Sequence, residues 1–357
     1  MVLTRYIAGA CAASSLVFHV SSAFGGDPRP FSAGEKVVFL GDSITHGGKY
    51  VTYLQMRLAE MFPEDPPILA NCGVNGDTAR GVLASKRLEW DVFPICPDRV
   101  FVMLGMNDVK RELWTSAEPV SDADACARRQ VLADYEKNLR KLVEVLSERV
   151  RFVVLMTPSP YDQYGEFDGK VLAGCNEPGL VGCAGIVRKV GREAGIPVVE
   201  LHDPLTTILK RDRKARLCGD DRVHPGTVGH SLIAAHILRA CGGSEMEAES
   251  LAKGLREDPC AKKAEECTDA VSRYRRVAEY RKVLRSMGGD DRDNAESDVL
   301  LDKWVESGRG TSWQKSAVKS AKAYRALRDH AVDLKRSADA VCAELIDEAR
   351  ASGRKVR

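Results

Sequence analysis

Short apolar runs of four or five residues alternate with longer amphipathic segments along the first two thirds of the chain. The short runs are rich in Val, Ile, Leu and Phe, which is typical of strands that are buried on both faces of a sheet. On this pattern we expect five strands, at residues 37–40, 68–71, 100–104, 152–156 and 198–201.

The segments between the expected strands have the periodicity of helices. One covers residues 50–62 and another covers residues 130–150. In the second, apolar side chains recur at helical spacing, at Leu132, Tyr135, Leu139, Leu142, Val143 and Leu146. Strands that alternate with helices predict a parallel sheet with helices on both faces. In such a sheet ligands bind outside the carboxyl ends of the strands, so polar residues directly after a strand are candidates for a site.

The pattern changes after a helix expected at residues 231–240, which Gly242 and Gly243 end. Residues 244–357 have no strand pattern and are rich in Ala, Lys, Arg and Glu. Apolar residues there follow a four–three spacing, at Leu327, Ala331, Leu334, Ala338, Val341 and Leu345. We therefore expect a main domain over residues 35–243 and an α-helical C-terminal region. That region either packs its apolar stripe on the main domain or offers a coiled-coil contact to a protein partner.

The N-terminal segment has the pattern of an export signal. Arg5 precedes an apolar stretch over residues 6–20, and small residues follow it. A buried helix or a membrane anchor is the alternative, although an anchor needs about 20 apolar residues and His19 interrupts this stretch. We expect residues 1–23 to be a signal peptide, residues 24–34 to be a linker, and the protein to be exported, to the periplasm or outside the cell. No later segment is apolar for long enough to span a membrane.

The composition and the cysteines agree with export. The 357 residues carry a net charge of +2, so the charge predicts no binding to nucleic acid or to an anionic membrane. Ten of the 11 cysteines lie beyond the expected signal peptide, and an even number fits disulfides formed in an oxidising compartment. Cys175 and Cys183 flank a loop with Gly and Pro and are the expected local pair; scattered buried thiols are the alternative.

Four polar segments are expected to converge on the carboxyl ends of the strands. The first, GDSIT, places Ser43 directly after the first strand. A serine hydroxyl becomes a strong nucleophile only when a base takes its proton. In DRVH, Asp221 and His224 are three residues apart, a spacing that brings side chains together on one helical turn. Asp221 is then expected to hold one ring nitrogen of His224 while the other nitrogen faces Ser43.

Acyl transfer also requires hydrogen-bond donors for the oxyanion that develops in the transition state. The segment NCGVNG after the second strand offers the backbone N–H of Gly73, where the missing side chain lets a carbonyl oxygen approach closely. The segment GMND after the third strand offers the side-chain amide of Asn107, and the backbone N–H of Ser43 is a third donor. Ser43, Gly73 and Asn107 are therefore the expected oxyanion hole.

With these segments in this order, the sequence resembles the SGNH hydrolases, also called GDSL hydrolases, whose name lists a Ser, a Gly, an Asn and a His in four blocks. The resemblance covers residues 36–240 and does not reach the C-terminal region. It implies an α/β, three-layer, flavodoxin-like fold with a five-stranded parallel sheet, an open active site and ester hydrolysis without a cofactor. The absence of a G-x-S-x-G motif argues against an α/β-hydrolase fold.

Substrate contacts are less well defined by the sequence. His46 lies three residues after Ser43, where it either contacts substrate or is an ordinary loop residue. Tyr161, Tyr164 and Phe167 follow the fourth strand and form either a sugar-stacking rim or a small satellite core. The sequence contains no motif for binding a metal, a nucleotide or a dinucleotide, and we expect no metal and no cofactor.

These residues together predict an exported serine esterase that hydrolyses acyl esters. Export and the resemblance to this family, in which GDSIT proteins of this layout are often glycan deacetylases, imply acetyl groups on carbohydrate as the leading hypothesis for its substrate. A lipase or lysophospholipase of the same family is the alternative, but the charged segment KRELW after GMNDV gives no sign of an apolar acyl groove. An alternative of another class is a non-catalytic binding or assembly protein that acts through its C-terminal helices. That alternative is disfavoured because none of the expected working residues is missing.

Overall fold

The computed structural model describes residues 28–289, 294–306 and 311–356, so the expected signal peptide lies outside the described residues. Five parallel strands form one sheet in the order β2-β1-β3-β4-β5. Each strand lies where an apolar run predicted it, and the α/β class with a five-stranded parallel sheet is confirmed. The strands are β1 Lys36–Gly41, β2 Ile68–Gly73, β3 Arg99–Met103, β4 Phe152–Met156 and β5 Val198–Val199.

The last strand is shorter than the sequence predicted. β5 pairs with β4 over only two residues. Beyond it, Thr157 Oγ1 accepts hydrogen bonds from the backbone N–H groups of Leu201 and His202, at 2.7 and 2.9 Å. These bonds satisfy the backbone in place of a continued ladder, so the chain turns into a helix at His202.

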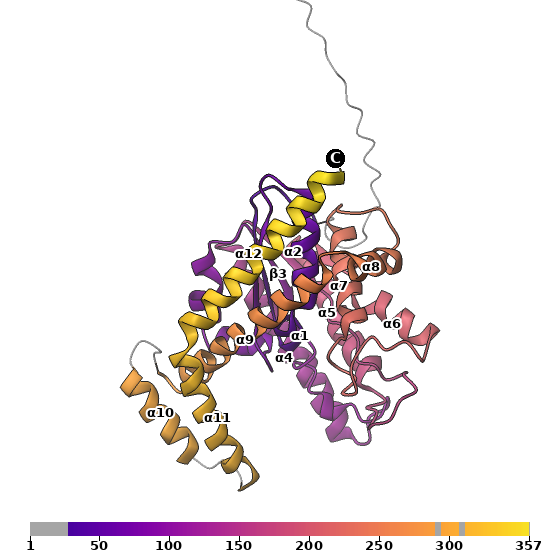
Figure 1. Ribbon diagram of the computed structural model, residues 1–357. Helices are drawn as coiled ribbons and strands as arrows, with labels where there is room; N and C mark the ends of the chain where they lie inside the picture. Colours follow the sequence, from indigo (N-terminus) through magenta and orange to yellow (C-terminus); the bar gives the residue numbers. More distant parts are fainter. Residues whose placement is uncertain (1–27, 290–293, 307–310, 357) are drawn as a thin grey trace, which may run out of the picture.

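Helices cover both faces of the sheet and complete three layers (Figure 1). α4 and α5 pack on β4 with α3 beside α4, whereas α2 and α7 pack on the other face. Aromatic side chains fill the centre, where the rings of Phe39 and Phe101 stack with centroids 4.9 Å apart. The helices up to residue 240 are α1 Ser43–Gly47, α2 Lys49–Met61, α3 Ala79–Ala84, α4 Asp122–Ser147, α5 Val181–Ala194, α6 His202–Arg211 and α7 Thr227–Ala240.

The segment before β1 packs on the domain, although residues 24–34 were expected to be a linker. Arg99, at the start of β3, is fully buried and pairs with the carboxylate of Glu35 at 2.9 Å. Its remaining donors bind the carbonyl oxygens of Arg29 and Pro30, both at 2.9 Å. A buried guanidinium needs such acceptors, so residues 29–31 are held against the amino end of the sheet.

The C-terminal helices enlarge the core of the main domain. α8 packs on α7, and both α9 and α12 pack on α2 (Figure 1). Leu345 of the expected stripe is buried in the core that includes the main domain, with Val341 packed against it, so packing on the main domain is confirmed for this part of the stripe. Ala349, one turn further along α12, is buried in the same core. None of the helices in the described ranges is long and apolar enough to cross a membrane. The C-terminal helices are α8 Ala248–Glu257, α9 Ala261–Ser286, α10 Asn294–Glu306, α11 Thr311–Asp329 and α12 Ala331–Val356.

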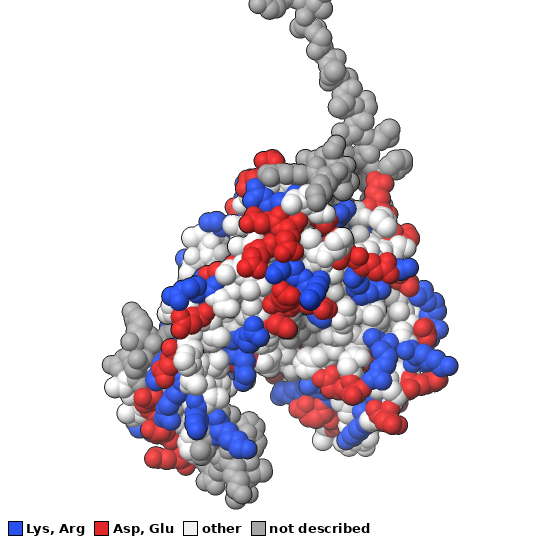
Figure 2. Space-filling view, in the orientation of Figure 1, with Lys and Arg blue, Asp and Glu red and all other residues white. Residues whose placement is uncertain are grey.

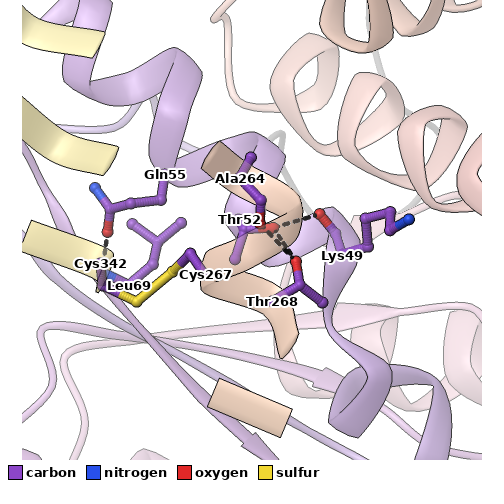
Figure 3. The surroundings of a disulfide bond; sticks show 8 residues. All are labelled: Lys49, Thr52, Gln55, Leu69, Ala264, Cys267, Thr268 and Cys342. Carbon is purple, nitrogen blue, oxygen red and sulfur yellow. Dashed lines mark hydrogen bonds between the residues drawn. A yellow bond between two sulfur atoms is a disulfide. The ribbon is translucent and has the colours of Figure 1, made fainter. Parts of the chain in front are cut away.

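A disulfide joins α9 to α12, between Cys267 and Cys342, whose Cα atoms are 5.3 Å apart (Figure 3). Beside it, the hydroxyls of Thr52 on α2 and Thr268 on α9 lie 2.6 Å apart. The expected pair of Cys175 and Cys183 is wrong, because both are buried as separate thiols. Cys267 and Cys342, which do form a disulfide, are 75 residues apart in the sequence, so no local loop indicates their pairing.

Candidate active site

Ser43 begins α1 directly after β1. The turn is fixed by Asp42, whose Oδ1 accepts the backbone N–H of Ile44 at 2.9 Å as an N-cap. Gly41 allows the turn because a Cβ there would lie 2.1 Å from Thr45 Oγ1 and 2.8 Å from the carbonyl oxygen of Met103. Burial raises the pKa of Asp42 to about 6. Strand, cap and helix together present the Ser43 side chain at the carboxyl end of the sheet.

His224 and Asp221 meet Ser43 in the order expected from the sequence. Ser43 Oγ lies 2.8 Å from His224 Nε2, and His224 Nδ1 is hydrogen-bonded to Asp221 Oδ2. We expected this pair to lie on one helical turn, but it lies in a non-helical loop. There Asp221 Oδ1 accepts the backbone N–H groups of Val223 and His224, both at 3.0 Å. Partial burial acts against ionisation, but the hydrogen bonds from His224 and Val223 keep the pKa of Asp221 below its usual range.

The loop that carries these two residues is anchored by a buried arginine. Arg222 lies between them with a φ of 62°, and its side chain is 2% exposed. Its guanidinium donates to the carbonyl oxygens of Asp162, Gly165 and Phe167, at 3.0, 3.1 and 2.5 Å. The loop after β4 therefore fixes the position of the Asp221–His224 pair from behind.

The three side chains lie in an open site. The side chains of His224 and Asp221 are about half exposed, and Ser43 is partly exposed. In the view of Figure 1, α1 lies above the gap between the α10–α11 pair and the lower end of α4. Figure 2 shows the molecular surface hollowed in the same place. A bulky alcohol portion of a substrate can therefore reach the serine without a deep channel.

Gly73 does not offer the free donor that the sequence predicted, and that expectation is wrong. Its backbone N–H donates to the side-chain oxygen of Asn71 at 2.8 Å. A Cβ on Gly73 would lie 2.0 Å from the backbone nitrogen of His46, so the glycine lets α1 rest against the end of β2.

Gly76, three residues further along, is the residue that the sequence analysis missed. It is exposed, has a φ of 68°, and its N–H forms no hydrogen bond with any described residue. The signal was the Gly-Asp-Thr sequence, in which Thr78 accepts the N–H of Gly81 and caps α3. A glycine in a tight turn just before a helix is a stronger donor candidate than one that still belongs to a strand.

Asn107 lies beside this loop. Its Nδ2 donates to the carbonyl oxygen of Asp77 at 3.0 Å, and its Oδ1 accepts from Arg111 at 3.2 Å. The two bonds fix which side-chain atom is the nitrogen, and the second N–H of Nδ2 remains for another acceptor. The amide of Asn107 is thus held by the residue that directly follows Gly76.

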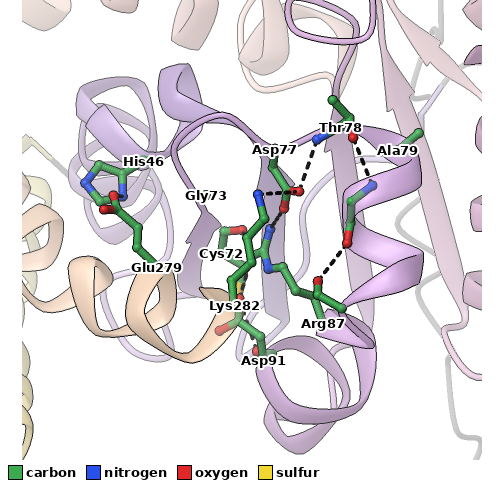
Figure 4. Close-up of polar contacts among 12 residues, drawn as sticks. His46, Cys72, Gly73, Asp77, Thr78, Ala79, Arg87, Asp91, Glu279 and Lys282 are labelled. Atoms are coloured by element: carbon green, nitrogen blue, oxygen red, sulfur yellow. Dashed lines mark hydrogen bonds and ion pairs between the residues drawn. The ribbon is translucent and has the colours of Figure 1, made fainter. Parts of the chain in front are cut away.

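A buried network of opposite charges supports the Gly76 loop from below (Figure 4). Asp77 and Arg87 are both fully buried and form an ion pair, and Arg87 also contacts Asp91 at 2.6 Å. Arg275 of α9 binds both carboxylate oxygens of Asp91, at 2.7 and 2.6 Å. Burial alone would raise the pKa of Asp91, but the charges of Arg275 and Arg87 outweigh it and hold the pKa well below its usual range.

The expected substrate contacts are not brought to the open surface. His46 is 6% exposed and lies under α9, with Nδ1 3.6 Å from Glu279, and burial lowers its pKa to about 4. Tyr161 is 3% exposed, and its hydroxyl accepts the N–H of Leu172 at 3.2 Å. Tyr164 is partly buried against the core. Tyr161 thus belongs to the main hydrophobic core and Tyr164 packs against it, so these two tyrosines form neither a separate satellite core nor an open sugar-stacking rim.

Asp108 is expected to make the stability of the protein fall as pH rises. Burial raises its pKa to about 7; its Oδ1 accepts the N–H of Ala79 at 2.9 Å, while Oδ2 is enclosed and has no partner among the described residues. Between about pH 4 and 7 the unfolded chain releases a proton that the folded chain retains. As the pH rises through this window, the free energy of unfolding of the wild-type protein should therefore fall relative to that of Asp108→Asn, by on the order of a few kcal/mol. Urea unfolding below, within and above this window measures it, and a constant difference between the two proteins would contradict the assignment.

A three-layer α/β domain with Ser43, His224 and Asp221 in hydrogen-bond contact at its strand ends defines a class, that of ester hydrolases. A model of the GDSL-like Lipase/Acylhydrolase family matches residues 39–232. An acetylxylan esterase of Geobacillus stearothermophilus is 32% identical over 238 residues, which are 59% of this chain and 95% of that protein. The chain belongs to the GDSL-like lipase/acylhydrolase family, as its four sequence blocks suggested, and is an esterase that acts on acyl ester bonds.

The fold likeness also extends beyond the family match. A gut microbial diltiazem-metabolizing enzyme of known structure superposes with a TM-score of 0.71, at 18% identity, over 91% of this chain and 97% of that one. A match of this length includes C-terminal helices as well as the main domain. Among the described residues, no group of His, Cys, Asp and Glu is arranged to hold a metal ion.

Proposed function

We propose that this esterase is an exported enzyme that removes acetyl groups from carbohydrate hydroxyls, with Ser43 as nucleophile, His224 as base and Asp221 as the residue that orients the base. The observation that carries the proposal is the contact between Ser43 Oγ and His224 Nε2, at 2.8 Å, with Asp221 hydrogen-bonded to the other ring nitrogen. A serine with this pair of neighbours is activated in the manner of a general catalytic triad.

The reaction takes place in two steps at the same three side chains. Ser43 Oγ attacks the ester carbonyl carbon while His224 Nε2 accepts the serine proton, and the imidazolium then gives that proton to the departing alcohol. Water, deprotonated by His224, attacks the acetyl-serine, and acetate leaves as Ser43 regains a proton. The N–H groups of Ser43 and Gly76 and the amide of Asn107 are the donors for the negatively charged oxygen of both tetrahedral intermediates.

Three observations support the acetyl and carbohydrate parts of the proposal. The relative at 32% identity is named an acetylxylan esterase. The half-exposed His224 and Asp221 give access to an acyl ester on a large alcohol. The disulfide between Cys267 and Cys342, together with the N-terminal sequence, supports export, since disulfides persist in oxidising compartments.

The proposal is tested by measuring acetate release from acetylated xylooligosaccharides, beside hydrolysis of p-nitrophenyl acetate and p-nitrophenyl octanoate. We expect acetate release from the sugar and a kcat/KM for the acetyl ester that is at least about 10-fold above that for the octanoyl ester, because the charged segment KRELW after GMNDV gives no sign of an apolar groove for a long acyl chain. A preference for octanoate would favour a lipase. Hydrolysis of the nitrophenyl ester without any release from acetylated sugars would contradict the carbohydrate assignment.

A further inference from the structure

Helix α9 of the C-terminal region touches the Gly76 loop on both sides of the glycine. Glu279 accepts a hydrogen bond from the side chain of Asn75, and Lys282 lies 3.1 Å from Asp77 Oδ1. Glu279 and Lys282 are three residues apart, which puts them on the same face of α9. Residues 75 and 77 are therefore each tied to one helix, and Gly76 lies between the two ties. Figure 4 shows the contact between Lys282 and Asp77.

These ties join parts of the chain that are about 200 residues apart, and they differ in burial: Asn75 is exposed, whereas the Lys282–Asp77 pair has a fully buried carboxylate. The side chain of Glu279 is 15% exposed and that of Lys282 is 24% exposed, while Asp77 is fully buried. Ion pairs and hydrogen bonds to a buried partner are worth more than those on the surface, because solvent screens them less.

α9 is itself held rigidly against the main domain. The Cys267–Cys342 disulfide fixes it to α12, and Arg275 binds Asp91 through both carboxylate oxygens. Arg275 also approaches the carbonyl oxygen of Gly73 at 3.4 Å. The helix is therefore a fixed support from which side chains can set the position of a short loop.

We infer that Glu279 and Lys282 are positioning residues of the esterase. Through their contacts with Asn75 and Asp77 they hold the N–H of Gly76 at the place where the oxyanion forms. The side-chain amide of Asn107, which donates to the carbonyl oxygen of Asp77, is held there with it. The inference rests on the proposed function of these two amides. It makes the C-terminal helical region a part of the catalytic apparatus, because a donor displaced by about 1 Å loses much of its effect on the transition state.

The test compares Lys282→Met, Glu279→Ala and the double variant with Lys262→Met. Lys262 is an exposed lysine on the same helix that forms no hydrogen bond or ion pair with a described residue. Two conservative variants, Lys282→Arg and Glu279→Gln, keep a donor for Asp77 and an acceptor for Asn75. Each protein is measured by its thermal midpoint, by kcat and KM for p-nitrophenyl acetate, and by amide hydrogen exchange of residues 74–78.

We expect faster exchange of the loop in both single variants and fastest exchange in the double variant. The value of kcat should fall by about 10-fold or more with KM changed less than about twofold, because the lost interaction acts only in the transition state. Lys282→Arg and Glu279→Gln should recover most of kcat, and Lys262→Met should behave as the wild type.

Three results would overturn the inference, and the first two are exchange of residues 74–78 that is unchanged in the double variant, and faster exchange with kcat unchanged. A loss of kcat that follows the thermal midpoint and is not rescued by the conservative variants would also overturn it, since it would indicate general loosening. If the wild-type protein hydrolyses no ester, the proposed function fails by itself, and the exchange experiment still decides whether α9 holds the loop.

Discussion

Replacement of Ser43 by alanine is expected to lower kcat/KM for p-nitrophenyl acetate by roughly 10⁴-fold or more, because no other hydroxyl is hydrogen-bonded to His224 Nε2 among the described residues. The oxyanion donors remain in Ser43→Ala, so a small residual rate above that of water is expected. The fold should be unaffected, since the lost hydroxyl makes its hydrogen bond to a histidine that is about half exposed.

The matched control is Ser147→Ala, at an exposed serine where α4 ends, for which we expect wild-type kinetics. Turnover is followed by release of nitrophenol, and circular dichroism and the thermal midpoint verify that the Ser43→Ala protein is folded. If a well-folded Ser43→Ala protein kept more than about a tenth of the wild-type rate, another nucleophile would have to be sought and the mechanism proposed above would fail.

The second large effect concerns stability and is expected at Asp91. Its carboxylate lies between the guanidinium groups of Arg87 and Arg275, and all three side chains are largely buried. Asp91→Ala leaves two buried cations without their shared partner, which costs about 3–5 kcal/mol when one member of a buried ion pair is removed. We expect a loss of this size in the free energy of unfolding, measured by urea titration near neutral pH.

Asp269→Ala serves as the control for Asp91→Ala. Asp269 is an exposed carboxylate on α9, and its replacement should change the free energy of unfolding by no more than about 0.5 kcal/mol. Because the pKa of Asp91 is held well below its usual range, the stabilisation is complete above about pH 4 and declines below it. If Asp91→Ala lowered the free energy of unfolding at neutral pH by less than about 1 kcal/mol, the expectation would be contradicted. Such a result would show that water or a shift of the helix compensates for the lost carboxylate.

The strands and the Ser43–His224–Asp221 contact could be predicted from the sequence because both follow from local signals. An apolar run of β-branched residues identifies a buried strand, and a polar cluster after it identifies the strand end. The sequence pointed to Gly73 because it lies directly after the expected second strand, and Gly76 was not considered. Only the backbone shows that β2 continues through Gly73 and that its amide is taken by Asn71.

The contribution of α9 could not be predicted, since no pattern links a charged residue near position 280 to a loop near position 76. Glu279 and Lys282 belong to a helix rich in charged residues, where each resembles an ordinary solvated side chain. For His46 and Tyr161 the sequence left a substrate contact and a structural role both open for a related reason: a residue close in sequence to a site can still point into the core. Burial of both side chains is a product of tertiary packing, which periodicity alone does not report.

The bond between Cys267 and Cys342 closes the polypeptide into a covalent ring that contains α10 and α11. A single break in the backbone anywhere within that ring leaves one connected molecule, with α12 still joined to α9 through sulfur. Such a nicked protein would migrate as one species under non-reducing conditions and as two fragments after reduction. Helix α9, which contacts the Gly76 loop, and helix α12, which packs on α9, thus stay joined even when the chain between them is cut.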